Sequence, residues 1–265
     1  MQVIDKITGD VKHYLKSLNG TQNVVLLSNP PLSSEAISEW ELTNNATLPS
    51  DLKAFFMVCN GLTLKWSASL FTQANQDPLL SVNPNVSHTA NPPNSKTIQA
   101  GNGSILSCKD LKRVRLDCVD PKKQYADRMK FGNIYFDANE EWSESSPSPP
   151  FPSSDSANPK SEIVAFAIDH NPDLGVVCLL LDGTSASVWL KEKSCRWHPL
   201  ASDFTSYFRL MLVHLAIQGW QFAFTDIGLP PYCKALLSRF APERLLVDLA
   251  SLPPPPPSPP PPPPE

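Results

Sequence analysis

The stretch at residues 203–232, DFTSYFRLMLVHLAIQGWQFAFTDIGLPPY, decides the fold of this chain. From Phe204 to Ile217 nearly every position is apolar, and only Arg209 and His214 clearly interrupt the apolar surface. A helix that is apolar almost all round has to be buried, so we expect a large buried helix around which the rest of the chain folds. A single histidine on such a helix is typical of a hydrogen-bonded core residue. Arg209 and His214 therefore either pair with groups inside the protein or lie at the edge of a partner-binding site.

Turn residues mark the exit from this helix. Gly219 stands where a left-handed C-cap is expected, and residues 220–224 (WQFAF) alternate with a period of two, as in a strand. Residues 225–231 then combine Thr, Asp, Gly and Pro in a turn-rich segment. None of these residues forms the pattern of a reaction centre.

Apolar periodicity and capping residues predict further helices and strands. Ser33 or Ser34 is expected to cap a short helix through Trp40, and Ser50 or Asp51 to cap the next helix. Leu52, Phe55, Phe56 and Cys59 form the inner face of that second helix, and Asn60 and Gly61 end it with a left-handed cap. The predicted helices cover residues 5–18, 33–40, 50–59 and 233–240, and the predicted strands cover residues 24–27, 62–66, 131–136, 163–168, 176–181 and 187–190.

The order of these elements predicts an α+β fold. The last three strands follow one another closely across turn signals at residues 171–175 and 182–183, which predicts an antiparallel meander. Helices that flank a mainly antiparallel sheet are typical of the α+β class. We expect one domain at residues 1–246 and a disordered proline-rich tail at residues 247–265. The domain contains a loop-rich, partly disordered insert at about residues 84–160 that is basic at 108–130. Five tryptophans in the ordered segments are expected to fill one core.

Composition excludes several classes of function. The net charge is −4 and the pI about 5.7, which disfavours broad binding to nucleic acid or to an anionic membrane. No window reaches about 18 uninterrupted apolar residues, and the N-terminus lacks the apolar core of a signal peptide. The six cysteines show no CxxC spacing and no cluster with histidine, so no zinc site is predicted. We therefore expect an intracellular protein with reduced thiols and without a transmembrane helix.

The sequence contains no recognisable catalytic motif. The P-loop, GxGxxG and GxSxG motifs are absent. Two pairs of carboxylates, Glu140 with Glu141 and Asp169 with Asp182, fall in low-complexity or turn sequence and are interpreted as solvated. The histidines occur singly, at His13, His88, His170, His198 and His214. We therefore expect a non-catalytic protein with no catalytic, cofactor-binding or metal-binding residues and no cofactor.

Two segments have the composition of partner-binding regions. Residues 109–130 carry eight Lys or Arg against four Asp, and either meet an acidic partner, such as the glutamate-rich tail of tubulin, or form a solvated insert. The run from Pro253 to Pro264 holds 11 of the 29 prolines. It predicts polyproline II, which profilin and SH3, WW or EVH-type modules bind. The alternative for this run is a low-complexity extension without a partner.

Two blocks of the sequence resemble known families. LPSDLKAFFMVCNG at residues 48–61 is similar to the LP-x-D-L…N-G signature of the SUKH superfamily, which includes fungal cell-wall regulators and bacterial toxin-immunity proteins. The second block, Trp197 and His198 with residues 203–230, resembles the subunit 2 family of tubulin polyglutamylase complexes. The resemblance covers roughly residues 1–85 and 160–243. The chain departs from the family in its longer insert and in a proline tail where the family has a Lys-rich extension.

The resemblance implies a non-catalytic scaffold subunit. In that family the subunit supports the addition of glutamate chains to tubulin, and the ligase is a separate polypeptide of the tubulin-tyrosine-ligase-like type. The implied partners are this ligase, other subunits of the complex, and tubulin or microtubules, bound directly or indirectly. The implied location is the cytoplasm, on the cytoskeleton, at microtubules and at the centrosome or cilium. The alternatives are a cytoskeletal adaptor that binds profilin or SH3/WW modules through its proline tail, and an enzyme whose site assembles only in the fold.

Overall fold

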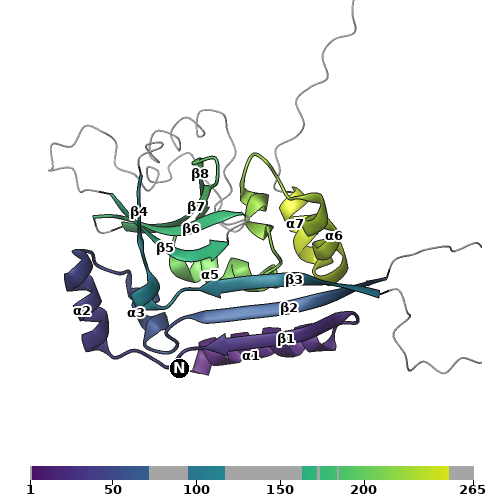
Figure 1. Cartoon of the computed structure of the whole chain (residues 1–265), viewed down its shortest axis with the longest axis horizontal. Coiled ribbons are helices and arrows are strands. Elements are labelled where there is room, and N and C mark those ends of the chain that lie inside the picture. Colours follow the sequence, from purple (N-terminus) through teal and green to yellow (C-terminus); the bar gives the residue numbers. More distant parts are fainter. Residues whose placement is uncertain (1, 72–94, 117–162, 172–173, 184, 251–265) are drawn as a thin grey trace, which may run out of the picture.

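The computed structural model describes residues 2–71, 95–116, 163–171, 174–183 and 185–250. These residues form two antiparallel sheets, of three and of five strands, with helices packed around them (Figure 1). The α+β class and the antiparallel strand pairing are therefore confirmed. The strands form two separate sheets rather than one.

The three-stranded sheet consists of β1 (Thr21–Ser28), β2 (Leu62–Phe71) and β3 (Ser95–Ile105), in that order. Assigning residues 95–103 to a loop-rich insert was wrong, because β3 pairs with β2 along its whole length. The segment carries few large apolar side chains because neighbouring groups lie too close. A Cβ on Gly101 would come within 1.9 Å of the indole Nε1 of Trp66, and a Cβ on Gly103 within 2.7 Å of Ala216.

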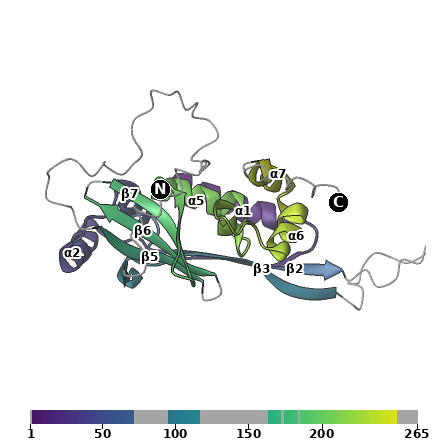
Figure 2. The ribbon, with the colours of Figure 1, turned by 90° about the horizontal axis from the view of Figure 1, so that it is seen from above.

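β1 includes the strand predicted at residues 24–27 and lies at the edge of this sheet. It pairs with β2 on one side only, and Val25 and Leu27 are 41% and 60% exposed. Helix α1 (Gln2–Ser17) precedes it and packs against it. Figure 2 shows α1 on the same side of this sheet as the C-terminal helices.

Two short helices, α2 (Ser34–Asn44) and α3 (Ser50–Phe56), connect β1 to β2. Ser33 caps α2, as predicted, by accepting a hydrogen bond from the backbone N–H of Ala36. The predicted cap of α3 was wrong: Pro49 occupies the N-cap position, and no side chain caps the helix. Proline already holds the extended backbone that leads into the helix, so Ser50 and Asp51 become its first helical residues.

The inner face of α3 is as predicted, because Leu52, Phe55, Phe56 and Cys59 are all buried. The helix ends earlier than predicted, at Phe56. Gly61 does adopt the left-handed conformation, with φ of 97°, but it stands at the entry to β2. There its α-carbon faces the backbone of residues 105–107, with no room for a side chain.

The five-stranded sheet is a meander in the order β4-β5-β6-β7-β8. The antiparallel run of the middle three strands and the turn at Gly183 are as predicted, whereas β8 was missed because it is short and contains Pro199. A 3-10 turn, η1, leads into the sheet. The elements are η1 (Cys108–Asp110), β4 (Arg113–Val114), β5 (Val164–Asn171), β6 (Gly175–Asp182), β7 (Ser185–Glu192) and β8 (Trp197–Ala201).

Part of the predicted insert belongs to the folded core. Cys108 and Leu111 are buried, and the backbone of Leu106 and Lys112 bonds to Ile168 and Ala167 of β5. Residues 84–94 and 117–160 of the predicted insert, with the strand predicted at 131–136, lie outside the described residues.

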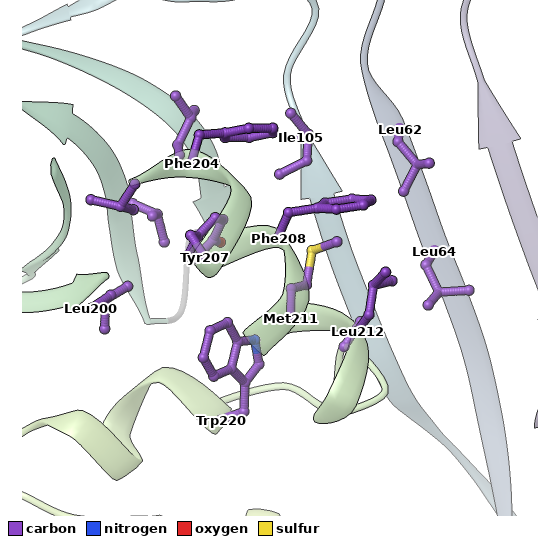
Figure 3. Close-up of a cluster of buried hydrophobic side chains, with 14 of the residues drawn as sticks. Leu62, Leu64, Ile105, Leu200, Phe204, Tyr207, Phe208, Met211, Leu212 and Trp220 are labelled. Carbon is purple, nitrogen blue, oxygen red and sulfur yellow. The ribbon is translucent and has the colours of Figure 1, made fainter. Parts of the chain in front are cut away.

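The predicted buried helix is α5 (Phe204–Val213), which lies between the two sheets. Figure 3 shows Phe208 and Met211 pointing toward Leu62 and Leu64 of the first sheet, while Tyr207 points toward Leu200 of the second. The helix ends four residues before its predicted end. Leu215 and Ala216 take left-handed conformations, with φ of 54° and 53°.

Gly219 has the predicted left-handed backbone, with φ of 85°, but it begins the next element instead of capping α5. Residues 220–224 form a 3-10 helix, η2 (Trp220–Phe224), and the strand-like alternation was misleading. None of the described strands pairs with them. Trp220 instead packs inward against the rings of Tyr207 and His214.

The chain then forms α6 (Pro231–Phe240) and α7 (Pro242–Ala250). α6 was predicted with Leu236, Leu237 and Phe240 on its buried face, and all three are buried. α7 was not predicted. It extends to Ala250 and therefore past residue 246, where the proline-rich tail was expected to begin; residues 251–265 lie outside the described part.

The tryptophans divide between two clusters instead of filling one core. Trp66 and Trp220 lie in the main cluster between the sheets, with Trp40 at its margin. Trp189 and Trp197 belong to a second cluster with Ala165, Cys178 and Leu180, whose side chains point to the opposite face of the five-stranded sheet. In the described segments, no helix combines the length and apolarity needed to cross a bilayer.

Candidate functional site

His214, the histidine singled out in the sequence, lies fully buried at the end of α5. Its Nδ1 is 2.6 Å from the carbonyl oxygen of Leu210, and its ring stacks on Trp220 with centroids 4.6 Å apart. A carbonyl oxygen can only accept, so Nδ1 carries the proton of this hydrogen bond. The prediction of a hydrogen-bonded core histidine is confirmed.

The other nitrogen of His214 faces two polar residues of α7. Its Nε2 lies 3.0 Å from Asp248 Oδ2 and 3.1 Å from Arg244 Nε. Arg244 also pairs with Asp248, at 2.6 Å between Nη2 and Oδ1. The ion pair with Arg244 therefore offsets part of the cost of taking the buried carboxylate of Asp248 out of water. These contacts fix which side of α7 turns toward α5.

As a consequence, α7 presents apolar side chains to the solvent. Leu246, Val247 and Leu249 are 67%, 45% and 41% exposed, whereas the buried residue of this helix is Asp248. A surface helix normally buries its apolar stripe and exposes its polar one. We call these three side chains the α7 outer face. Exposed apolar side chains gathered on one element are typical of protein-binding surfaces.

Arg209 is the second polar exception on α5, and it is exposed. The structure gives it no hydrogen bond or ion pair with a described residue. Val213 follows four positions later on the same face of the helix and is 49% exposed. Of the two alternatives for Arg209, internal pairing is excluded within the described chain. The second alternative, the edge of a partner site, stays a prediction.

The space beside α7 is too small for a cofactor. A cavity of about 30 Å³ is lined by residues of η2, the following loop, α6 and α7: Ala223, Gly228, Leu229, Lys234, Asp248 and Leu249. This volume suits a single water molecule. The features of this region therefore suit contact between protein surfaces better than binding of a small molecule.

Sequence reasoning missed a second polar cluster, at the end of β7 and in β8. His198 is 1% exposed and lies between two carboxylates: its Nε2 contacts Glu192, and its Nδ1 is 3.8 Å from Asp226. Arg196 pairs with the same two carboxylates, at 3.4 Å and 3.0 Å. Two acidic and two basic side chains thus join the β7–β8 turn to the loop after η2. Three of these residues lie within positions 192–198, but Asp226 follows Glu192 by 34 positions, so local sequence does not reveal the whole cluster.

The donor atoms of this cluster also fit the chemistry of a metal site in part. Glu192, His198 and Asp226 each offer one ligand atom, and these atoms lie within 4.8 Å of one another. Imidazole with carboxylates suits divalent transition metals. However, the guanidinium of Arg196 already forms ion pairs with both carboxylates, and a metal ion would have to displace it. We interpret the cluster as an ion-pair network.

Of the two carboxylate pairs considered in the sequence, only Asp169 and Asp182 lie in the described residues, and these two lie apart. Asp169 was interpreted as a solvated turn residue, and this was wrong: it is 5% exposed at a bulge of β5 and accepts a hydrogen bond from Ser104. It lies near Tyr207, where burial raises the pKa of the phenol well above its usual value and the charge of Asp169 adds to the increase. This polar group joins β3, β5 and α5 inside the core. Asp182 lies apart from it, at the β6–β7 turn, and Glu140 and Glu141 lie outside the described residues.

Of the basic run at residues 109–130, only the part up to residue 116 is described. Lys109, Lys112, Arg113 and Arg115 are exposed along the edge of the five-stranded sheet. His13 is exposed on α1, whereas His88 and the proline run at 253–264 lie outside the described residues.

Comparison with known proteins agrees with the resemblance seen in the sequence. The model of the SMI1 / KNR4 family (SUKH-1) matches residues 31–210, so α6 and α7 follow the matched region. The chain is 26% identical over 245 residues to the Homo sapiens protein named tubulin polyglutamylase complex subunit 2, a match that covers 90% of this chain and 70% of that protein. The Rattus norvegicus and Mus musculus proteins of the same name are 25% and 24% identical, over 90% of this chain and 72% of theirs. No solved structure matches the chain significantly.

Proposed function

Because the chain belongs to the SMI1 / KNR4 (SUKH-1) family, we propose that it is a non-catalytic, partner-binding subunit of a tubulin polyglutamylase complex. The observation that carries this proposal is the similarity to proteins named as subunit 2 of that complex, which extends over 90% of the chain. In this function a separate ligase of the tubulin-tyrosine-ligase-like type adds glutamate to tubulin. The present chain holds the ligase or other subunits in place, in the cytoplasm on microtubules and at the centrosome.

The α7 outer face supports a binding role. It lies on a helix that follows the matched family region, and the buried contacts of Asp248 hold its apolar side outward. Three large exposed side chains on nine residues are an unfavourable arrangement in water unless a partner covers them. We assign this face to contact with another subunit. The exposed cations at residues 109–115 are a second contact, for the acidic tail of tubulin.

Affinity purification of the tagged full chain from cells tests the proposal. The wild type is expected to co-purify a ligase that glutamylates tubulin, and Leu246→Lys is expected to lower its recovery about tenfold, because a charge is placed in a desolvated contact. Leu42→Lys is the matched control, since Leu42 is 83% exposed on α2. Absence of both the ligase and tubulin from the wild-type preparation would refute the proposed function.

A second assay addresses the non-catalytic role. The purified chain is incubated with ATP, glutamate and tubulin, and incorporation of glutamate into tubulin is followed by mass spectrometry. We expect no incorporation until the ligase is added. Incorporation by the chain alone would contradict this part of the proposal.

The proline run supports a second candidate function, that of a cytoskeletal adaptor. Its 11 prolines within residues 253–264 suit the aromatic grooves of profilin and of SH3 or WW modules. Deleting residues 252–265 separates the two functions. If the complex still assembles and only profilin binding is lost, the run is an accessory; if all partners are lost, the adaptor function is the correct one.

A further inference from the structure

We propose that the outer edge of β1 binds an extended segment of a partner protein, which adds to the three-stranded sheet as a further strand. This edge is a different surface from the α7 outer face, and the proposal does not depend on the chain belonging to a particular complex. It follows from the direction of the backbone groups of residues 24–28, from the exposed side chains of β1, and from the absence of charged residues and proline in this strand.

The register shows which backbone N–H and C=O groups of β1 point away from β2. The N–H of Asn29 bonds to the carbonyl of Gly61 at 3.2 Å, and Ser28 lies opposite Leu62 in β2. In an antiparallel pair, residues whose backbone N–H and C=O point toward the neighbouring strand alternate with residues whose backbone groups point away from it. The N–H and C=O groups of Leu26 and Ser28 therefore point away from β2, and among the described strands none pairs with them.

The sequence of β1 has few of the features that protect an exposed edge. Its sequence, TQNVVLLS, contains no charged residue and no proline. The one irregularity, between Gln22 and Val25 with Asn23 at a φ of 53°, lies at the beginning of the strand. Val25 and Leu27 are exposed beside the outward backbone groups. An uncharged, apolar edge of this kind pairs readily with another chain, so we infer that it is occupied in the functional assembly.

The chemistry of the edge specifies its occupant. The outward groups of Leu26 and Ser28 alternate donors and acceptors at strand spacing, which only an extended backbone can match. A helix has its own backbone groups paired and leaves these unsatisfied. The side chains of Val25 and Leu27 share one face of the sheet. The occupant therefore carries apolar residues at alternate positions on that face.

A peptide-binding experiment tests the proposal with the full chain. The probe is a fluorescent peptide, acetyl-Lys-Val-Thr-Val-Thr-Val-Lys-amide, and the matched probe carries N-methyl groups on alternate backbone nitrogens, which block strand pairing. Anisotropy titration is expected to show saturable binding of the first probe and not of the second. Ser28→Pro removes an outward N–H and Leu27→Lys places a charge at the edge, so each is expected to weaken binding about tenfold or more.

Leu42→Lys, the same type of change on an exposed leucine of α2, is expected to leave binding unchanged. Circular dichroism verifies that each variant folds, and Leu27→Lys keeps the test valid if Ser28→Pro does not fold. Failure of the wild type to bind the probe, or equal binding of the N-methylated probe, overturns the proposal. A dimer of the chain in sedimentation experiments that Ser28→Pro abolishes would also overturn it, because a second copy would then occupy the edge.

Discussion

Substituting Asp51 tests the contact between helices α3 and α5 that the structure shows. Asp51 lies on α3, yet its Oδ2 accepts hydrogen bonds from the backbone N–H of Thr205 at 2.8 Å and from the Thr205 hydroxyl at 3.2 Å. Asp203, the local N-cap of α5, accepts from Ser206 N at 2.7 Å. The first turn of α5 therefore has two carboxylates, one of them supplied from a position 154 residues earlier in the chain.

The expected loss in Asp51→Ala can be estimated from these contacts. Removing an N-cap side chain costs about 0.5–2 kcal/mol, and a hydrogen bond to a charged group contributes about 1.5–3 kcal/mol. The negative charge beside the helix N-terminus adds a few tenths. Because the site is partly buried, we expect the free energy of unfolding to fall by about 2 kcal/mol. For a domain of this size, that corresponds to a decrease in Tm of about 4–8 °C.

Urea unfolding followed by far-UV circular dichroism measures this loss. Ser50→Ala is the control, because local sequence makes Ser50 an equally good cap for α3, whereas the structure gives α3 no side-chain cap. Its free energy of unfolding is expected to stay within about 0.5 kcal/mol of the wild type. A loss in Ser50→Ala as large as that in Asp51→Ala, or no loss in Asp51→Ala, would refute the reasoning.

Three further predictions concern packing, thiol reactivity and the α7 contacts. Gly101→Ala places a Cβ 1.9 Å from the buried indole of Trp66 and is expected to lower the free energy of unfolding in urea by about 2–4 kcal/mol. Gly9→Ala meets no atom within 4 Å and is expected to raise that free energy by up to about 1 kcal/mol. Iodoacetamide at about pH 8 is expected to modify half-buried Cys195 before buried Cys178. Burial raises the pKa of Cys178 to about 12, so only about 10⁻⁴ of this thiol is present as the reactive thiolate. Mass spectrometry that shows the reverse order of modification would contradict this. Asp248→Ala is expected to cost about 2–3 kcal/mol and to speed amide exchange throughout α7, while unchanged exchange would show that its ion pair does not hold the helix.

The local sequence pattern was sufficient to predict those helices and strands whose buried residues lie close together in the sequence. The apolar run of α5, the inner face of α3 and the meander β5–β7 were all predicted, because the period of each matches the geometry of a single helix or strand. β3 was missed for the opposite reason. Its positions are small or polar because Trp66 and α5 leave no room for larger side chains, and that requirement comes from a neighbour that is distant in sequence.

The candidate site was predictable only in part. The isolated His214 on an apolar helix pointed to a buried hydrogen bond, and that prediction is confirmed. Its partners Asp248 and Arg244 lie in a helix that was not predicted, and the outward position of Leu246 follows from those partners. Polarity along α7 alone would have placed Leu246 and Leu249 inward, beside the partly buried Leu245.

The sequence by itself determined the class of the fold, the central helix and the family, since each depends on apolar spacing or on short motifs within a continuous segment. The tertiary structure decided how those segments are used. It turned Asp51 of the LPSDL motif toward a helix in the other half of the chain, placed β1 at the edge of its sheet, and held α7 with Leu246, Val247 and Leu249 exposed. The physical reason is that hydrogen bonds and ion pairs between distant residues leave no periodicity in the sequence, whereas the burial of one helix or strand face does.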